Sequence, residues 1–169
     1  KDVPDQLRAN QDSPINLDRE ATEFVTVKAM IKREKLFMSA FMAGSVWTFD
    51  YDGVVSSPTT NQVLQWNDAN STPIEDIEAA KTSILSLTGF RPNKLVLGYQ
   101  VFAALKRHPD IISLINAGQT PGGPALASLN TLASVFGVDE IIVSEAIENT
   151  AQEGQTKSMS FIGGKKAWL

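Results

Sequence analysis

The sequence has no cysteine and a single histidine, His108, among its 169 residues. Without cysteine there is no disulfide framework, no thiol nucleophile and no zinc site built on thiolates. One histidine excludes metal sites that need several imidazole ligands. We therefore predict no metal site, no cofactor and no catalytic residues, and the missing thiols fit a reducing compartment.

Positive charge and long apolar runs are also scarce. The formal net charge is -4 and the pI about 5.0, whereas a dominant sequence-independent nucleic-acid surface would need a basic excess. No apolar run approaches the roughly 18 residues that cross a bilayer, and the first residues lack a signal-peptide pattern. We expect neither secretion nor a membrane partner.

Both ends of the sequence lead us to expect a piece of a longer protein. The first residue is Lys1 rather than methionine, and the last two, Trp168 and Leu169, are apolar. Natural termini are more often polar and frayed.

A long helix is predicted from Asp18 to about Met42, a stretch without proline or glycine. Apolar residues recur there at spacings that keep them on one helical face. They are Phe24, Val27, Ile31, Met38 and Met42. Leu36 and Phe37 lie off this stripe, so the helix has apolar residues on more than one side.

Shorter elements follow the helix. A strand is predicted over Val46–Val55, then a polar loop to Ser71, and a helix that starts at Thr72-Pro73-Ile74-Glu75 with a hydroxyl cap and ends at Gly89. The remaining elements are a strand at Leu95–Leu97, a helix from about Gln100 to Arg107, a short helical turn at Ile111–Ile115, a helix over Leu126–Phe136 closed by Gly137, and strands at Ile141–Val143 and Met159–Ile162. The segment from about Asn149 to Lys157 is predicted to be a polar connection.

The fold class is predicted to be α+β, with the long helix attached to a compact mixed lobe. Residues 1–17 are expected to form an N-terminal arm or linker, residues 18–71 the part with the long helix, and residues 72–169 an α+β lobe that is truncated at its C-terminal end.

The sharpest enzymatic signal is Asp50-Tyr51-Asp52-Gly53, which resembles the first motif of haloacid-dehalogenase-type phosphatases. There Asp50 would be the nucleophile and Asp52 the general acid/base beside magnesium, with Ser144 and Lys157 extending the site. That family also needs a later acidic pair, and no acid follows Lys157. A solvated turn is the favoured interpretation.

Two other motifs have structural interpretations. Gly163-Gly164-Lys165-Lys166 lacks the full phosphate-loop pattern and is interpreted as a turn or strand kink. His108, before Pro109, is interpreted as a cation at a helix C-terminus.

The whole pattern resembles the major capsid proteins of tailed bacteriophages with the Hong Kong 97-type fold, over about Pro14 to Leu169. The segments that carry the resemblance are Asn16–Glu20 leading through Arg33–Phe37 to Val46-Trp47, then Trp66–Asp68, Ser71–Ile77, Thr88–Gly98, Val101–Leu105, His108–Ile111, Phe136–Val138, Ile141–Val143 and Phe161–Gly163. They are fold motifs rather than active-site motifs.

The resemblance implies a non-enzymatic shell subunit that assembles with copies of itself into pentamers and hexamers, with the long helix as the spine of a peripheral domain and the lobe as an axial domain. The shell would enclose DNA without strong sequence-specific binding, with scaffold and portal proteins as further partners, in the virion after assembly in the host cytoplasm. An encapsulin-like compartment shell is the alternative within the same fold.

Residues that could contact neighbouring subunits follow from this implication. The candidates from the long helix are Lys28, Lys32, Arg33, Leu36 and Phe37. The candidates from the Gly118–Pro124 loop are Gln119, Thr120 and Pro121.

Overall fold

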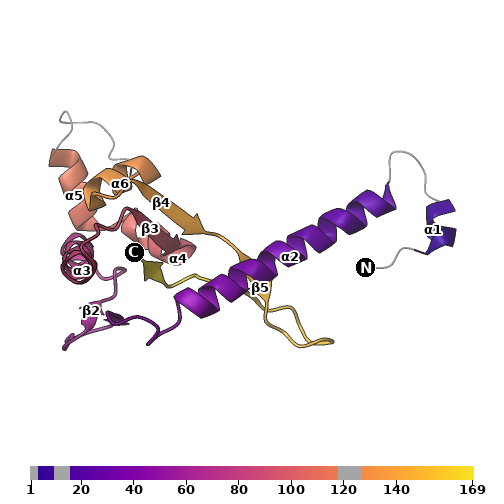
Figure 1. The fold of residues 1–169 in the computed structure, drawn as a ribbon, viewed down its shortest axis with the longest axis horizontal. Helices are drawn as coiled ribbons and strands as arrows, with labels where there is room; N and C mark the ends of the chain where they lie inside the picture. The colour runs from indigo at the N-terminus through magenta and orange to yellow at the C-terminus, as the bar shows by residue number, and fades with distance from the viewer. Residues whose placement is uncertain (1–3, 10–15, 118–126) are drawn as a thin grey trace.

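A computed structural model describes residues 4–9, 16–117 and 127–169. A short helix, α1 (Asp5–Ala9), precedes the 25-residue helix α2 (Leu17–Phe41), which stands out from a lobe of mixed helices and strands (Figure 1). At 1.5 Å per residue α2 is roughly 37 Å long. The Asn16 side chain caps it by accepting the Arg19 N–H at 3.1 Å. The predicted long helix and the α+β class are confirmed.

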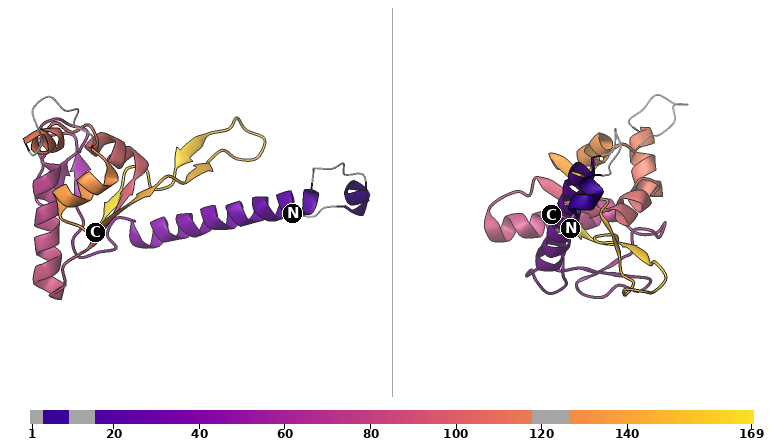
Figure 2. Two further views of the ribbon diagram at one scale, coloured as in Figure 1. Left: turned by 90° about the horizontal axis from the view of Figure 1, so that it is seen from above. Right: turned by 90° about the vertical axis from the view of Figure 1, so that its right-hand side faces the viewer.

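The C-terminal part of α2 meets the lobe, whereas its N-terminal half runs clear of it (Figure 2). A hairpin of β5 (Ile147–Asn149) and β6 (Met159–Phe161) projects from the lobe in the same direction. Within α2 only Ala21 and Met38 are buried. The molecule therefore has a compact part and two projecting elements.

A three-stranded sheet forms the centre of the lobe. Its middle strand, β3 (Lys94–Gly98), pairs in parallel with β4 (Glu140–Ser144) and antiparallel with β7 (Ala167–Trp168). Between β3 and β4 the chain forms α4 (Tyr99–Leu105), α5 (Pro109–Ala117) and α6 (Leu129–Phe136), and α3 (Pro73–Thr88) comes before β3. This long connection lets β4 return beside β3 in the parallel direction.

Successive side chains of β3 point to opposite faces of the sheet, so the strand divides the apolar interior into two clusters. The main core holds Ile77, Leu95, Leu97, Leu105, Ile111, Ile115, Ala127, Leu132, Phe136, Val138 and Ile141. The second cluster holds Met38, Met42 and Val96, with Phe37, Ile162 and Trp168 against them. The second cluster attaches α2 to the sheet.

The ends of α3 follow the prediction in position but not in every contact. Pro73 occupies the first turn as expected, yet the Thr72 side chain makes no capping hydrogen bond, so the predicted hydroxyl cap is wrong. Gly89 ends the helix with φ of 72°, and its N–H donates to the Leu85 carbonyl at 2.9 Å. Glycine adopts this left-handed conformation without a steric cost.

The remaining lobe helices differ from the prediction mainly at their ends. The helix predicted from about Gln100 is α4, and the predicted single turn at Ile111–Ile115 is the nine-residue α5. Ser128 caps α6 by accepting the Thr131 N–H. Gly137 closes α6 at φ 61° as predicted, whereas Leu126 lies outside the described residues.

The strand predicted over Val46–Val55 is largely wrong. Only β1 (Asp52–Val54) is a strand, and it pairs in parallel with β2 (Gln62–Leu64), which lies in the segment predicted to be a loop. Upstream of β1 the backbone turns instead, because Ser45 has φ of 63° and the Trp47 indole N–H donates back to the Phe41 carbonyl at 2.7 Å.

His108 follows the end of α4, as the sequence predicted, and its side chain turns into the lobe. Its side chain is only 3% exposed, and its Nδ1 accepts the Asp110 N–H at 3.3 Å. Its Nε2 lies 3.1 Å from both the Ser71 hydroxyl and the Asp68 carbonyl oxygen. The imidazole links the loop before α3 to the start of α5.

Candidate assembly surface

Two adjacent side chains of α2 make polar contacts that hold it to the lobe. Ser144, at the end of β4, donates its hydroxyl hydrogen bond to Glu34 Oε1 at 2.6 Å. Lys35 Nζ lies 2.8 Å from Glu148 Oε2 on β5. Because Ser144 and Glu148 flank the junction of β4 and β5, the two contacts fix α2 against the base of the hairpin. We call them the polar tether.

One helical turn further on, an apolar contact completes the attachment. Met38 and Met42 pack on Val96 of β3, and a Cβ on Gly163 would lie only 2.8 Å from the Met38 methyl carbon. Lys166 Nζ donates to the Met42 carbonyl oxygen at 2.5 Å, which satisfies an acceptor at the end of the helix.

Four aromatic rings cover this junction on its outer side. Phe37, Phe41, Trp47 and Trp168 form a closed chain of contacts with centroid distances of 5.1 to 6.4 Å. Trp47 and Phe41 keep 46% and 42% of their surface exposed. This aromatic group therefore stabilises the α2 attachment and also presents apolar surface to the outside.

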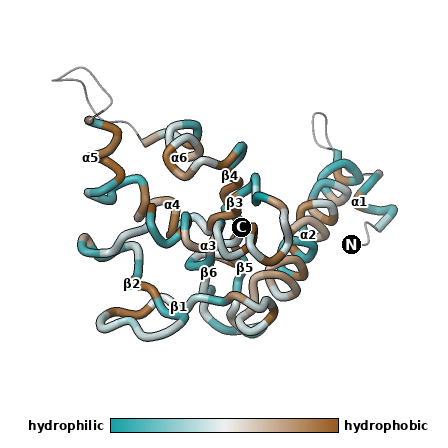
Figure 3. Tube along the Cα trace, turned by 60° about the vertical axis from the view of Figure 1, so that its left-hand side comes forward, coloured by the Kyte–Doolittle hydropathy of each residue, from teal (hydrophilic) through white to brown (hydrophobic). Residues whose placement is uncertain are grey.

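The free half of α2 exposes large apolar side chains that its own lobe does not cover. Phe24, Val25, Val27 and Met30 are 47% to 64% exposed, and Leu36, in the attached part of the helix, is 59% exposed. Figure 3 shows apolar and polar segments interleaved along the helix. Large apolar side chains that are exposed together on one element are typical of association surfaces. This surface is the main candidate for assembly contacts.

The predicted contact residues divide into three groups. Lys28, Lys32, Arg33 and Leu36 are exposed on α2, with Lys28 Nζ 5.5 Å from the centroid of the Phe24 ring. Phe37 is half-buried in the aromatic group, so much of its surface is used within the chain. Gln119, Thr120 and Pro121 lie outside the described residues. Their roles as subunit contacts stay predictions.

The phosphatase arrangement is not assembled. Asp50 and Asp52 are exposed, and the Asp50 carboxylate accepts the Ser45 N–H instead of ending a buried strand. Ser144 is engaged with Glu34, and Lys157 lies in the β5–β6 connection. Across residues 4–9, 16–117 and 127–169, no group of acidic or imidazole side chains could hold a metal ion.

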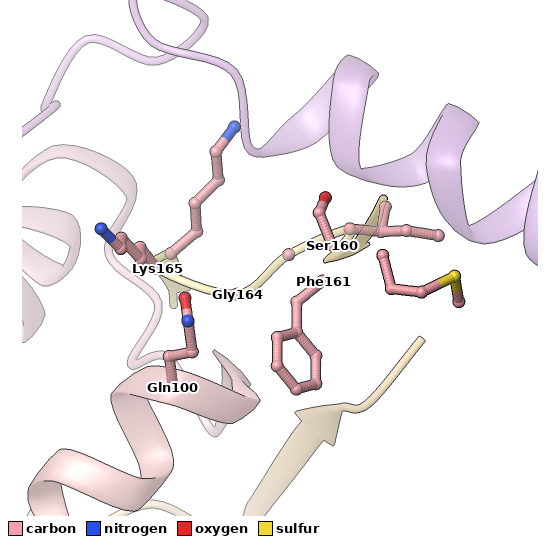
Figure 4. A pocket seen from close by; sticks show the side chains of 9 residues that line it. Gln100, Ser160, Phe161, Gly164 and Lys165 are labelled. Atoms are coloured by element: carbon pink, nitrogen blue, oxygen red, sulfur yellow. The ribbon is translucent and has the colours of Figure 1, made fainter. Parts of the chain in front are cut away.

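A depression of about 500 Å³ lies between the start of α4 and the segment from β6 to Lys166. Figure 4 shows Gln100 from α4 pointing toward the Gly164 segment, with the Phe161 ring beside it. The Lys166 N–H donates to the Gly163 carbonyl, so the predicted turn is confirmed. The described lining residues include no carboxylate and no histidine, which gives the depression little means for acid–base chemistry.

The helices within the described ranges include none that is long and apolar enough to cross a membrane. The long helix α2 carries charged residues throughout, from Asp18 to Lys35.

Comparison with known proteins decides the family. The sequence matches the family described as "Phage major capsid protein E" over residues 28–169. The chain belongs to this family. The resemblance to tailed-phage major capsid proteins, predicted from the sequence, is thereby confirmed at the level of phage major capsid proteins.

Two similar proteins show how much of a relative's length this capsid-family chain spans. It is 28% identical over 146 residues to a "Major capsid protein" of Burkholderia phage BcepMu, an alignment that covers 86% of this chain and 45% of that protein. Its structure is similar to the crystal structure of a phage-related protein from Bordetella bronchiseptica RB50, with a TM-score of 0.66 and 22% sequence identity. The similarity covers 91% of this chain and 46% of that protein. The chain therefore spans about half the length of both relatives.

Proposed function

We propose that this chain is part of a structural subunit of a phage capsid, which associates with copies of itself into pentamers and hexamers of a closed shell. One observation carries the proposal: the free half of α2 exposes apolar side chains that neighbouring subunits would cover. The family match gives the kind of assembly, since its members are described as phage major capsid proteins.

Within this proposal the fold is of the Hong Kong 97 type. Residues 1–17 are an arm or linker, residues 18–71 belong to a peripheral domain with α2 as its spine, and residues 72–169 form an axial lobe. The fold likeness to a phage-related protein and the separation of α2 from the lobe both support this division.

The partners follow from the same proposal. The shell encloses DNA in the virion without strong sequence-specific binding, in keeping with the acidic pI of about 5.0. Scaffold and portal proteins are further partners, and assembly takes place in the host cytoplasm. An encapsulin-like compartment is less favoured because the matched family and relative are named for phages.

Negative-stain electron microscopy of the expressed protein tests the proposal. We expect closed shells or their pentamers and hexamers, and we expect Val27→Glu with Met30→Glu to reduce them while leaving the circular dichroism spectrum unchanged. Thr26→Glu, at an exposed polar position directly before Val27, is the matched control and should assemble normally. A uniformly monomeric protein with magnesium-dependent phosphatase activity lost in Asp50→Asn would contradict the proposal.

A further inference from the structure

The β5–β6 hairpin has two different faces. Its cross-strand pairs are Ile147 with Phe161, Glu148 with Ser160, and Asn149 with Met159. Side chains alternate along a strand, so Glu148 and Ser160 share one face, and the Lys35 contact turns that face toward α2. The opposite face, which we call the outer hairpin face, presents Ile147 and Met159 at 44% and 45% exposure. Phe161 on the same face is 36% exposed and stacks on Tyr99 of α4, with 5.4 Å between the ring centroids.

A matching surface runs along α2. Lys28, Lys32 and Lys35 are spaced by four and three residues, so they lie on one side of the helix. Val25 and Leu36, which are 47% and 59% exposed, lie beside them. We call this surface the lysine face. In an interface its apolar side chains would be buried and its lysines would form the polar rim.

The two projecting elements carry opposite charge. Residues 28–35 of α2 include four cations and one carboxylate, whereas residues 145–161 of the hairpin segment include three carboxylates and one lysine. In a single molecule the pair Lys35–Glu148 joins them at their common base. Beyond that base they diverge (Figure 2). The ion pairs among the described residues do not include Lys32, Glu145 or Glu153.

We propose that the outer hairpin face of one copy docks on the lysine face of α2 in a second copy. The inference rests on the proposed function and specifies which surfaces meet. Because the hairpin and the helix are different surfaces, each copy offers its hairpin to one neighbour and receives a hairpin from another in a head-to-tail arrangement. Such contacts close into rings when the rotation between copies permits.

The physical contributions to this contact differ in kind. Burial of apolar surface provides an attraction that does not depend on direction. The side chains that become covered are Val25, Leu36, Ile147 and Met159. The pairing of Glu145 and Glu153 with Lys28 and Lys32 provides the orientation and makes association sensitive to salt.

A charge swap tests the docking. The helix variant carries Lys28→Glu with Lys32→Glu, and the hairpin variant carries Glu145→Lys with Glu153→Lys. In sedimentation velocity we expect wild-type protein to associate with rising concentration, and each variant alone to associate at least about tenfold more weakly. An equimolar mixture of the two variants should regain association, because every hairpin then meets a helix of opposite charge. Lys106→Glu with Arg107→Glu makes the same charge change at the end of α4 and should behave as wild type.

Disulfide trapping provides a second measurement, because the chain has no cysteine of its own. A mixture of Val25→Cys and Met159→Cys proteins should give crosslinked heterodimers under mild oxidation. Thr26→Cys, one residue away and turned by about 100° around the helix, should crosslink far less with Met159→Cys.

The outcomes separate this docking from the proposed function. Shells in the microscope together with a charge swap that changes nothing would overturn the docking and leave the shell function standing. Wild-type protein that stays monomeric at every concentration, or a mixture that does not regain association, would also overturn the docking. If the mixture regains association but the wild type forms no shells, the shell function is contradicted and the docking stands.

Discussion

At the scale of single residues, Gly98 has the least room for a side chain among the described glycines. A Cβ built there would lie 1.8 Å from the Gly163 carbonyl oxygen and 2.6 Å from that of Gly164. Both obstacles are backbone atoms, and the Gly98 N–H itself donates to the Lys166 carbonyl at 2.8 Å. Glycine is therefore required where the end of β3 meets the turn before β7.

Gly98→Ala should lower the free energy of unfolding by at least about 1–3 kcal/mol, because two backbone segments must separate to admit one methyl group. Urea denaturation followed by circular dichroism measures this. Gly53→Ala is the matched control, since its Cβ would make an ordinary contact of 3.5 Å with the flexible Gln65 side chain. Equal midpoints for the two variants would contradict the close approach.

Asp76 is a partly buried carboxyl in the first turn of α3. Burial raises its pKa above the ordinary value of 3.8, the negative charge of Glu75 adds to the rise, and the hydrogen bond from the Trp66 indole N–H at 2.8 Å lowers it in part. The native state therefore holds this proton more tightly than the unfolded chain does. The resulting stabilisation is present below pH 3.8 and is lost as the pH rises through the raised pKa.

Asp76→Asn should remove this pH dependence while keeping an oxygen that accepts from Trp66. The variant is then expected to become more stable relative to wild type as the pH rises above 3.8 and through the raised pKa. Chemical denaturation at several pH values measures the difference. Parallel stability profiles for the two proteins would show that Asp76 titrates alike in the folded and unfolded states.

At the scale of elements, the polar tether and the second cluster are what attach α2. Glu34 and Ser144 are 110 residues apart in sequence, and their hydrogen bond joins the helix to the end of β4. Along the helix toward Leu17, the side chains are mostly exposed. The attachment is thus confined to the last turns of α2.

Ser144→Ala with Lys35→Ala should loosen this attachment without unfolding the lobe. A hydrogen bond to a charged group contributes about 1.5–3 kcal/mol, and an exposed ion pair about 0.2–1 kcal/mol. We expect faster amide hydrogen exchange over residues 34–42 with nearly unchanged exchange in β3. Arg33→Ala, an exposed neighbour on the same helix, should leave the exchange at both places as it is. Faster exchange throughout β3 would mean that the helix and the lobe open together.

The elements that the sequence predicted well are those with a local signal. The long apolar stripe of α2, the proline and glycine at the ends of α3, and the buried run of β3 each determine structure within a few residues. The missed strands, β2, β5 and β7, have two or three residues each and exist through pairing with partners elsewhere in the chain. The exposure of Lys28 and Lys32 was predictable from the helix, whereas the tether between Glu34 and Ser144 required the tertiary structure.

At the scale of the whole molecule, a compact lobe carries a helix with a separate surface, so the two parts should differ in resistance to proteolysis. Limited digestion with trypsin is expected to cut first after Lys28, Lys32 or Arg33, which are exposed on the free part of α2. A folded fragment that contains α3 to β7 should persist, as mass spectrometry and circular dichroism would show. Cleavage within the lobe at the same rate would argue against residues 72–169 as a unit.

The antiparallel pairing of β7 with β3 also imposes an order on folding. Trp168 pairs with Val96 and packs with Met38 and Met42, so the contacts that seat α2 join residues from both ends of the sequence. During synthesis the main core around Leu95 and Leu97 can form first. The second cluster, which attaches α2, remains incomplete until residues 167–168 leave the ribosome. The projecting helix is therefore made before the lobe and fixed in place after it, which delays its final orientation until the lobe exists to set it.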